Sequence, residues 1–221
     1  MFYNFLFPKK KEEEKQESEE SVPHKVIKDN IFELDVDKMV STSTFEITPS
    51  ELIETAKKVI ENGIGIHNPD DLADDFQFIF PVIGPLSKKH YLDNLKMFDL
   101  QTMLPDSSEG IYYNFHVDPY EHDRVWFVSR LITEHKGGGF FGPPTFKIVN
   151  CPPQMCSFKF NKDGKVILYT GGYVMDRTIG NTKGLGGLFG ILYSIGKPLP
   201  FPEANPPKKS WQLQIFSFVK S

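Results

Sequence analysis

Apolar residues in the first half of this chain recur at a helical period, and those in the second half recur at a strand period. Between residues 49 and 62 one stripe at helical spacing carries the apolar side chains Leu52, Ile53, Ala56, Val59 and Ile60. Thr48 and Glu51 have the spacing of a capping box, and Gly63 follows as a typical helix end. The pattern therefore predicts an amphipathic helix over residues 49–62.

The next stretch predicts two more helices with a strand between them. Residues 69–74 favour a short helix, and residues 75–80 favour a strand that runs into a Pro/Gly turn. Ser87 is a suitable N-cap for a helix over residues 87–98, whose apolar positions share one face. Three helices are thus expected before residue 100.

Beyond residue 110 the pattern predicts long, mostly antiparallel strands. We expect strands over residues 110–118, 124–135, 145–150, 156–161 and 165–177. Lys162-Asp163-Gly164 is a strong hairpin turn, and Gly171-Gly172 inside the last strand predicts a bulge or a sharp bend. Helices followed by a strongly curved sheet indicate an α+β fold.

Charged and Gly/Pro-rich segments flank this predicted domain over residues 49–179. Residues 1–22 include the run KKKEEEKQESEE, which predicts a solvated tail, and residues 23–48 predict an arm. Residues 180–221 form a Gly/Pro-rich extension that we expect to pack on the domain, with a final strand at 211–219.

Composition limits the classes of function. The 221 residues carry a formal net charge of −4, which argues against a nucleic-acid partner, and 20 of them are Phe, which favours a core or pocket lined with rings. Cys151 and Cys156 alone do not make a disulfide scaffold. The sequence has no apolar run long enough for a transmembrane segment. We expect a soluble intracellular protein, cytoplasmic by default, with an organelle as the alternative.

Three fragments carry a resemblance to a known family. They are Leu72-Ala73-Asp74-Asp75-Phe76, then Thr133-Glu134-His135-Lys136-Gly137, then Asp163-Gly164-Lys165-Val166 running to Tyr173-Val174-Met175-Asp176. In this order and spacing, residues 50–177 resemble the SnoaL-like branch of the nuclear transport factor 2-like superfamily. The resemblance implies a cone with one inner pocket and a homodimer formed through the outer face of the sheet. Tyr112, Phe127 and Phe158 are the rings expected on that face.

Two enzymatic branches of the superfamily differ from this chain at their motifs. Where the steroid-isomerase branch has its two acids, this sequence has Phe80 and Cys156, so that chemistry is not favoured. The iota-class carbonic anhydrases end in a His-His-His-Ser-Ser run, and this chain has Tyr173-Val174-Met175-Asp176-Arg177 at that place. Carbonic anhydrase-like hydration stays an alternative without its motif.

Asp176 and His135 are the candidate catalytic residues. Asp176 shares a face with apolar strand residues, where desolvation would raise the carboxyl pKa and suit a general acid or base. A strand-end carboxylate paired with Arg177 or Arg130 is the structural alternative. His135 could transfer protons near a strand end, or it could be an exposed histidine beside a glycine loop.

The candidate ligand-binding residues are Arg130, Tyr91, Tyr113, Trp126 and Phe80. Arg130 would hold an anionic group, although an internal ion pair would serve it equally well. The two tyrosines could donate hydrogen bonds into the pocket, or they could be core residues.

Three hypotheses for function remain open. The first is a cofactor-free lyase, isomerase or cyclase that acts on a small, largely apolar molecule. The second is a module that binds such a molecule without catalysis, and the third is an adaptor or subunit of a larger assembly. No metal or cofactor is expected. The aromatic content favours a small-molecule pocket.

Overall fold

The computed structural model describes residues 34–105, 110–138, 142–208 and 210–211 of the chain. The predicted tail over residues 1–22 lies outside these ranges, and so does nearly all of the final strand predicted over residues 211–219. The helices are α2 (Val36–Ser41), α3 (Pro49–Glu61), α4 (Lys88–Phe98), α5 (Leu100–Met103) and α6 (Gly187–Ser194). Short 3-10 turns cover Pro69–Asp71 and Pro202–Ala204.

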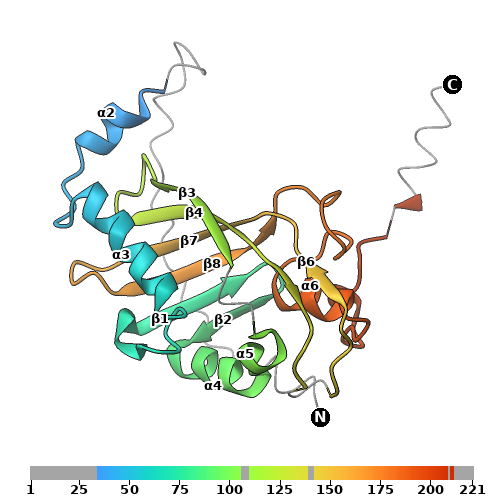
Figure 1. Ribbon diagram of the computed structural model, residues 1–221. Helices are drawn as coiled ribbons and strands as arrows, with labels where there is room; N and C mark the ends of the chain where they lie inside the picture. The colour runs from blue at the N-terminus through green and yellow to red at the C-terminus, as the bar shows by residue number, and fades with distance from the viewer. Residues whose placement is uncertain (1–33, 106–109, 139–141, 209, 212–221) are drawn as a thin grey trace, which may run out of the picture.

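A six-stranded mixed sheet has the order β2-β1-β8-β7-β4-β3, and β5 and β6 form a separate two-stranded sheet. The strands are β1 (Leu72–Phe80), β2 (Ile83–Ser87), β3 (Ile111–Val117), β4 (Arg124–Arg130), β5 (Ile132–Glu134), β6 (Ile148–Asn150), β7 (Gln154–Phe160) and β8 (Val166–Val174). All pairs in the large sheet are antiparallel except β1 with β8. In Figure 1, α3 crosses the sheet, α4 runs below β1 and β2, and α6 lies beside β6. The predicted α+β fold is confirmed.

The predicted ends of α3 and α4 are confirmed by their caps. Thr48 and Glu51 form a reciprocal capping box, in which the Thr48 hydroxyl accepts from the Glu51 N–H and the Glu51 carboxylate accepts from the Thr48 N–H. The Ser87 hydroxyl accepts from the N–H of His90 at the start of α4. Each cap is formed by residues within one helical turn of each other, so it can be predicted from the local sequence alone.

The double glycine produces the predicted bulge in β8. Ser157 pairs with Thr170 and Met155 pairs with Tyr173, so three steps on β8 match two on β7. Gly172 has a φ of +75°, a backbone conformation that glycine adopts without steric cost. The bend turns the end of β8 toward α6.

Strand β2 forms where only a Pro/Gly turn was expected, and the strand predicted over residues 145–150 begins at Ile148. Two larger predictions are also wrong. Residues 69–74 do not form a helix, because the 3-10 turn ends at Asp71 and Leu72 already pairs with Val166 of β8. Residues 124–135 do not form one strand, because β4 leaves β7 after Ser129 and the chain pairs again with β6 from Ile132. In both places contacts between distant segments override the local pattern.

Two hydrophobic clusters form the core. The first joins the sheet to α3 and to the inward face of α4, with Phe76, Phe127, Phe158 and Phe160 among its fully buried residues. The second joins the end of α4 to α5, β6 and α6. A cavity lies between the two clusters, since residues of both line it.

Candidate functional site

A cavity of about 560 Å³ lies between the sheet and the helices α3, α4 and α6. This volume is in the range typical of small-molecule sites. The residues that line it come from the end of α3, the inward face of α4, α5, all the strands of the large sheet and the N-terminal part of α6. Figure 1 shows these elements, far apart in the sequence, around the middle of the molecule, and their residues line one cavity.

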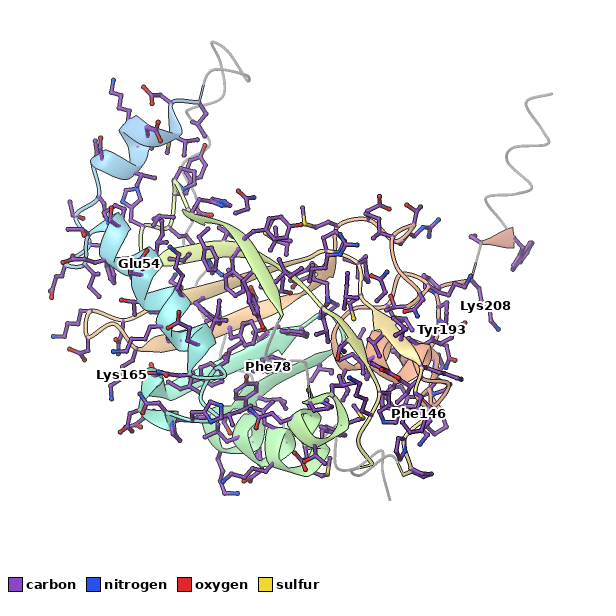
Figure 2. The ribbon with its side chains drawn as sticks, viewed as in Figure 1. Glu54, Phe78, Phe146, Lys165, Tyr193 and Lys208 are labelled. Carbon is purple, nitrogen blue, oxygen red and sulfur yellow. The ribbon has the colours of Figure 1, made fainter. Side chains whose placement is uncertain are left out.

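Aromatic rings make up the wall on the side of β1. The rings of Phe78 and Phe80 stack with centroids 4.4 Å apart, and Phe78 lies 4.9 Å from Tyr91. Tyr169 meets Phe80 edge-on, with centroids 5.4 Å apart. Figure 2 shows Phe78 in the middle of the molecule, between the sheet and α4. Offset and edge-to-face pairs of this kind hold one another in fixed orientations, so the wall is preformed.

Phenols and a thiol form the polar end of the cavity. Ser129 Oγ lies 3.5 Å from the sulfur of Cys156, and Tyr169 lines the cavity beside this thiol. Burial raises the pKa of Cys156 and raises the pKa of Tyr169 well above its ordinary value. Burial also raises the pKa of Tyr112, which lines the cavity next to them. These groups are therefore neutral hydrogen-bond donors at physiological pH.

Charged and strongly polar groups lie at the rim. Glu61 and His67 both line the cavity and are exposed to solvent. The side-chain amide of Gln101 lies 3.3 Å from His67 Nε2. The arrangement resembles that of many ligand sites, with an apolar interior, a few directed polar groups and a wet entrance.

Three of the predicted ligand-binding residues line this cavity: Phe80, Tyr91 and Arg130. Tyr91 is buried, its hydroxyl donates to the carbonyl of Ile64 at 3.3 Å, and burial raises its pKa. It serves as a core tyrosine with a satisfied hydroxyl as well as a piece of the wall.

Arg130 meets the cavity at its edge, at the end of β4. Alternation along the strand places its side chain on the face opposite Ser129, which points to the interior. Its Nε is buried and has no hydrogen-bond partner among the described residues. The alternative of an internal ion pair, with Asp176 as one partner considered, is not found for Arg130 among the described residues.

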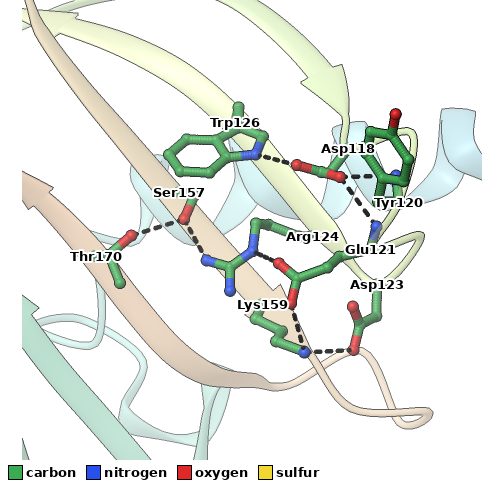
Figure 3. Close-up of polar contacts among 9 residues, drawn as sticks. All are labelled: Asp118, Tyr120, Glu121, Asp123, Arg124, Trp126, Ser157, Lys159 and Thr170. Atoms are coloured by element: carbon green, nitrogen blue, oxygen red, sulfur yellow. Dashed lines mark hydrogen bonds and ion pairs between the residues drawn. The ribbon is translucent and has the colours of Figure 1, made fainter. Parts of the chain in front are cut away.

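Tyr113 and Trp126 do not line the cavity, and they lie on the other face of the sheet. Trp126 Nε1 donates to Asp118 at 2.8 Å, and the Arg124 guanidinium lies 5.5 Å from the Trp126 ring centroid. Figure 3 shows this network, in which Arg124 also bonds Glu121 and Ser157. Trp126 was predicted on the wrong face of β4, because both faces of this strand carry apolar residues and the sequence does not show which one points inward.

The rings expected at a dimer surface are also placed differently. Phe127 and Phe158 are fully buried in the core, and Tyr112 lines the cavity. Phe127 faces inward because it alternates with Val125 and Ser129 toward α3 and the cavity, and Phe158 pairs with Val125 on the same face. The homodimer itself stays a prediction, but Phe127 and Phe158 cannot form its contact, whereas Tyr112 is 37% exposed.

Asp176 lies in solvent, outside the cavity. It follows the end of β8, and its carboxylate accepts hydrogen bonds from the N–H and the hydroxyl of Thr178 at 2.8 and 2.6 Å. These bonds hold the pKa of Asp176 below its ordinary value. The expectation of a desolvated carboxyl with a raised pKa is therefore wrong, because the chain turns away from the sheet after Val174.

His135 is fully buried, but it lies outside the cavity, directly after β5 in the two-stranded sheet of β5 and β6. Its Nδ1 accepts from the backbone N–H of Thr145 at 3.0 Å, and its Nε2 has no partner among the described residues. Desolvation lowers the pKa of His135, and the nearby charge of Lys197 lowers it further. Both sequence-based expectations, a proton shuttle in the pocket and an exposed histidine, differ from this placement.

The lowered pKa of His135 predicts a loss of stability in mild acid. Unfolded histidine takes up a proton near pH 6.5, whereas the folded side chain takes it up only at lower pH. Below about pH 6.5 the unfolded chain thus binds more protons, and the free energy of unfolding falls as the pH falls toward the folded pKa. Urea unfolding between about pH 7.5 and pH 5.5 measures this slope.

His135→Asn is expected to flatten that slope, because the buried group no longer titrates. The exposed His116 gives the matched control, since His116→Asn should leave the slope of the wild-type protein in place. Equal slopes in the wild-type protein and in His135→Asn would show that the buried histidine does not cause the loss of stability in mild acid.

Sequence reasoning missed Tyr112, Ser129 and Tyr169 as cavity residues, and it used Cys156 only as the place of a missing acid. A usable signal was present in β7, where Cys156, Phe158 and Phe160 alternate as apolar residues and mark the inward face. The partners of that face on β4 and β8 depend on strand register. Register is set by pairing across the sheet, which a single sequence does not contain.

No family model matches this sequence, and neither does any curated protein. Solved structures with a similar fold exist at low sequence identity. A candidate SnoaL-like polyketide cyclase from Jannaschia sp. CCS1 has a TM-score of 0.49 and 18% identity, over 71% of this chain and 97% of that chain. A candidate hydroxylase from Streptomyces galilaeus has a TM-score of 0.48 and 14% identity, over 78% and 94% of the two chains. An LEH-like epoxide hydrolase from M. tuberculosis has a TM-score of 0.43 and 12% identity, over 66% of this chain and 93% of that chain.

The fold class predicted for residues 50–177, helices followed by a mostly antiparallel sheet, is the one that the structure shows. Within the described ranges, no group of three or more His, Cys, Asp or Glu side chains is placed to hold a metal ion. No helix in that part of the chain is long and apolar enough to cross a membrane.

Proposed function

We propose that this chain binds one small, largely apolar molecule in the cavity and holds an oxygen atom of that molecule at the polar end. The observation that carries the proposal is the combination of an aromatic wall with neutral donors deep inside a space of about 560 Å³. The apolar wall would supply most of the affinity through burial. The phenols would supply orientation.

The polar end favours an uncharged acceptor such as a ketone, enol or ether oxygen. Tyr169 and Tyr112 stay protonated because burial raises their pKa values, so each can donate one hydrogen bond. A carboxylate beside these phenols would lose its hydration. Arg130, the guanidinium of the described lining, lies on the face of β4 opposite Ser129 and would not meet it there. The molecule is therefore expected to be neutral where it meets the phenols.

Acid–base chemistry of the lyase, isomerase or cyclase type is the second candidate, favoured by one observation. Neutral phenols can stabilise an enolate oxygen that develops during proton transfer beside a carbonyl group. A proton acceptor would have to come from the rim, where Glu61 and His67 line the cavity. Ligand binding needs neither Glu61 nor His67, so binding without catalysis is the simpler function.

Prodan, a neutral naphthyl ketone whose fluorescence moves to shorter wavelength in apolar surroundings, tests the proposal. We expect saturable binding to the wild-type protein with a shift to shorter wavelength. Tyr169→Phe keeps the ring and removes the hydroxyl, so prodan affinity should fall about threefold to tenfold, the range for one neutral hydrogen bond. A fluorescence titration measures both values.

Tyr113→Phe is the matched control, because Tyr113 is a half-exposed tyrosine on the same sheet that does not line the cavity. Its prodan affinity should equal that of the wild-type protein. Absence of saturable binding would contradict the proposed function, and equal losses in the two variants would contradict the role of the Tyr169 hydroxyl.

A further inference from the structure

A second hollow of about 300 Å³ lies next to the cavity, on the far side of a thin wall. Five residues border both spaces, and only three of them have side chains, namely Phe80, Ile83 and Leu188. The other two are Gly172 and Gly187, from the bulge of β8 and the start of α6. Few side-chain atoms therefore separate the two spaces.

The ring of Phe80 rests on glycine backbone. A Cβ built at Gly172 would lie 2.5 Å from Cδ2 of Phe80, and one built at Gly171 would lie 3.0 Å from its Cε1. The ring also stacks on Phe78, with centroids 4.4 Å apart. These glycines leave room for the ring and for nothing larger, so Phe80 occupies the place where the two spaces would otherwise meet.

The second hollow is mostly apolar. Pro81, Val82, Leu185 and Phe189 line it together with the shared wall, and the carboxylate-bearing Glu203 is the charged side chain in its lining. Tyr169, which belongs to the polar end of the main cavity, lies 5.4 Å from Phe80, measured between ring centroids. An alkyl chain of the bound molecule that extends from the held oxygen atom toward the second hollow would meet the Phe80 ring first.

We propose that Phe80 sets the length of the molecule that the cavity accepts, and that the second hollow is a subsite for an unbranched, uncharged alkyl tail. The inference rests on the proposed function. With the Phe80 ring in place, only a short apolar group fits between the held oxygen atom and the second hollow. Without the ring, a longer tail extends from the main cavity into the second hollow.

Prodan and laurdan test the proposal, because they share one fluorophore and differ in the length of the acyl chain. Each additional methylene that enters an apolar space tightens binding by about fourfold. The ratio of laurdan affinity to prodan affinity should therefore rise about tenfold or more in Phe80→Ala, through entry of a few methylenes. Leu188→Ala removes the side chain that α6 contributes to the shared wall, and it should also raise the ratio.

Leu95→Ala is the matched control for Leu188→Ala, because Leu95 lines the main cavity and not the second hollow. It removes an equal number of atoms and should leave the ratio unchanged. Thermal unfolding shows which variants are folded. An unchanged ratio in folded Phe80→Ala and Leu188→Ala would overturn the tail subsite while leaving the proposed function intact. A wild-type protein that binds neither probe would overturn the proposed function, and the subsite with it.

Discussion

Phe158→Ala is expected to lower the free energy of unfolding by about 3–5 kcal/mol, the usual cost of removing a buried phenylalanine ring. Phe158 is fully buried at the centre of the ring network, with centroids 4.9 Å from Phe127 and 5.0 Å from Tyr169. The truncation removes apolar contacts and leaves a void that close-packed neighbours fill only in part. Urea unfolding measures the change.

The same variant should also weaken prodan binding, because Phe158 supports the Tyr169 ring that carries the buried hydroxyl. Phe146→Ala is the matched control: Phe146 is 66% exposed and lies at the periphery of the molecule in Figure 2. Its stability should change by no more than about 0.5 kcal/mol. A similar loss in both variants would contradict the placement of Phe158 in the core.

Gly186→Ala is expected to destabilise the protein by about 1–3 kcal/mol and to weaken ligand binding. Gly186 precedes α6 with a φ of −99°, which any residue adopts, so the cost is purely steric. The added Cβ would lie 2.3 Å from the carbonyl oxygen of Gly172 and 2.9 Å from Oε1 of Gln154. Backbone cannot rotate away, so α6 has to move from β8.

That movement would reach the cavity, because Gly187, Leu188 and Ile191 of α6 line it. Thermal unfolding and a prodan titration measure the two effects. Gly138→Ala adds the same methyl group where the nearest described atom is 3.6 Å away, and it should change neither quantity. Normal stability in Gly186→Ala would show that α6 does not pack against the β8 bulge as described.

Features set by neighbouring residues could be predicted from the sequence. The Thr48–Glu51 capping box and the turn at Asp163-Gly164 each depend on residues a few positions apart. The bulge at Gly171-Gly172 also follows from local chemistry, because few residues other than glycine adopt its backbone conformation.

Features set by pairing between distant segments could not be predicted. The parallel pairing of β1 with β8 begins at Leu72 and Val166, and it converts a segment with helical local preference into strand. A single sequence carries no signal for that contact, so the boundary at residues 69–74 was wrong.

The candidate site shows the same division. Phe80 was noted because the resemblance places an acid of the pocket at its position, and Tyr91 was chosen as a possible phenol donor; both line the cavity. Trp126 was placed on the wrong side because alternation along β4 does not say which face is inside. Asp176 was chosen from an apolar alternation that ends at the bulge, beyond which the carboxylate is exposed.

The most direct test of the account is a crystal structure of the protein with bound prodan. We predict one prodan molecule in the cavity, with its naphthyl rings against Phe78 and Phe80 and its carbonyl oxygen within hydrogen-bond distance of the Tyr169 hydroxyl. Prodan bound only on the outer face of the sheet, near Tyr113, with the cavity unoccupied, would contradict the account.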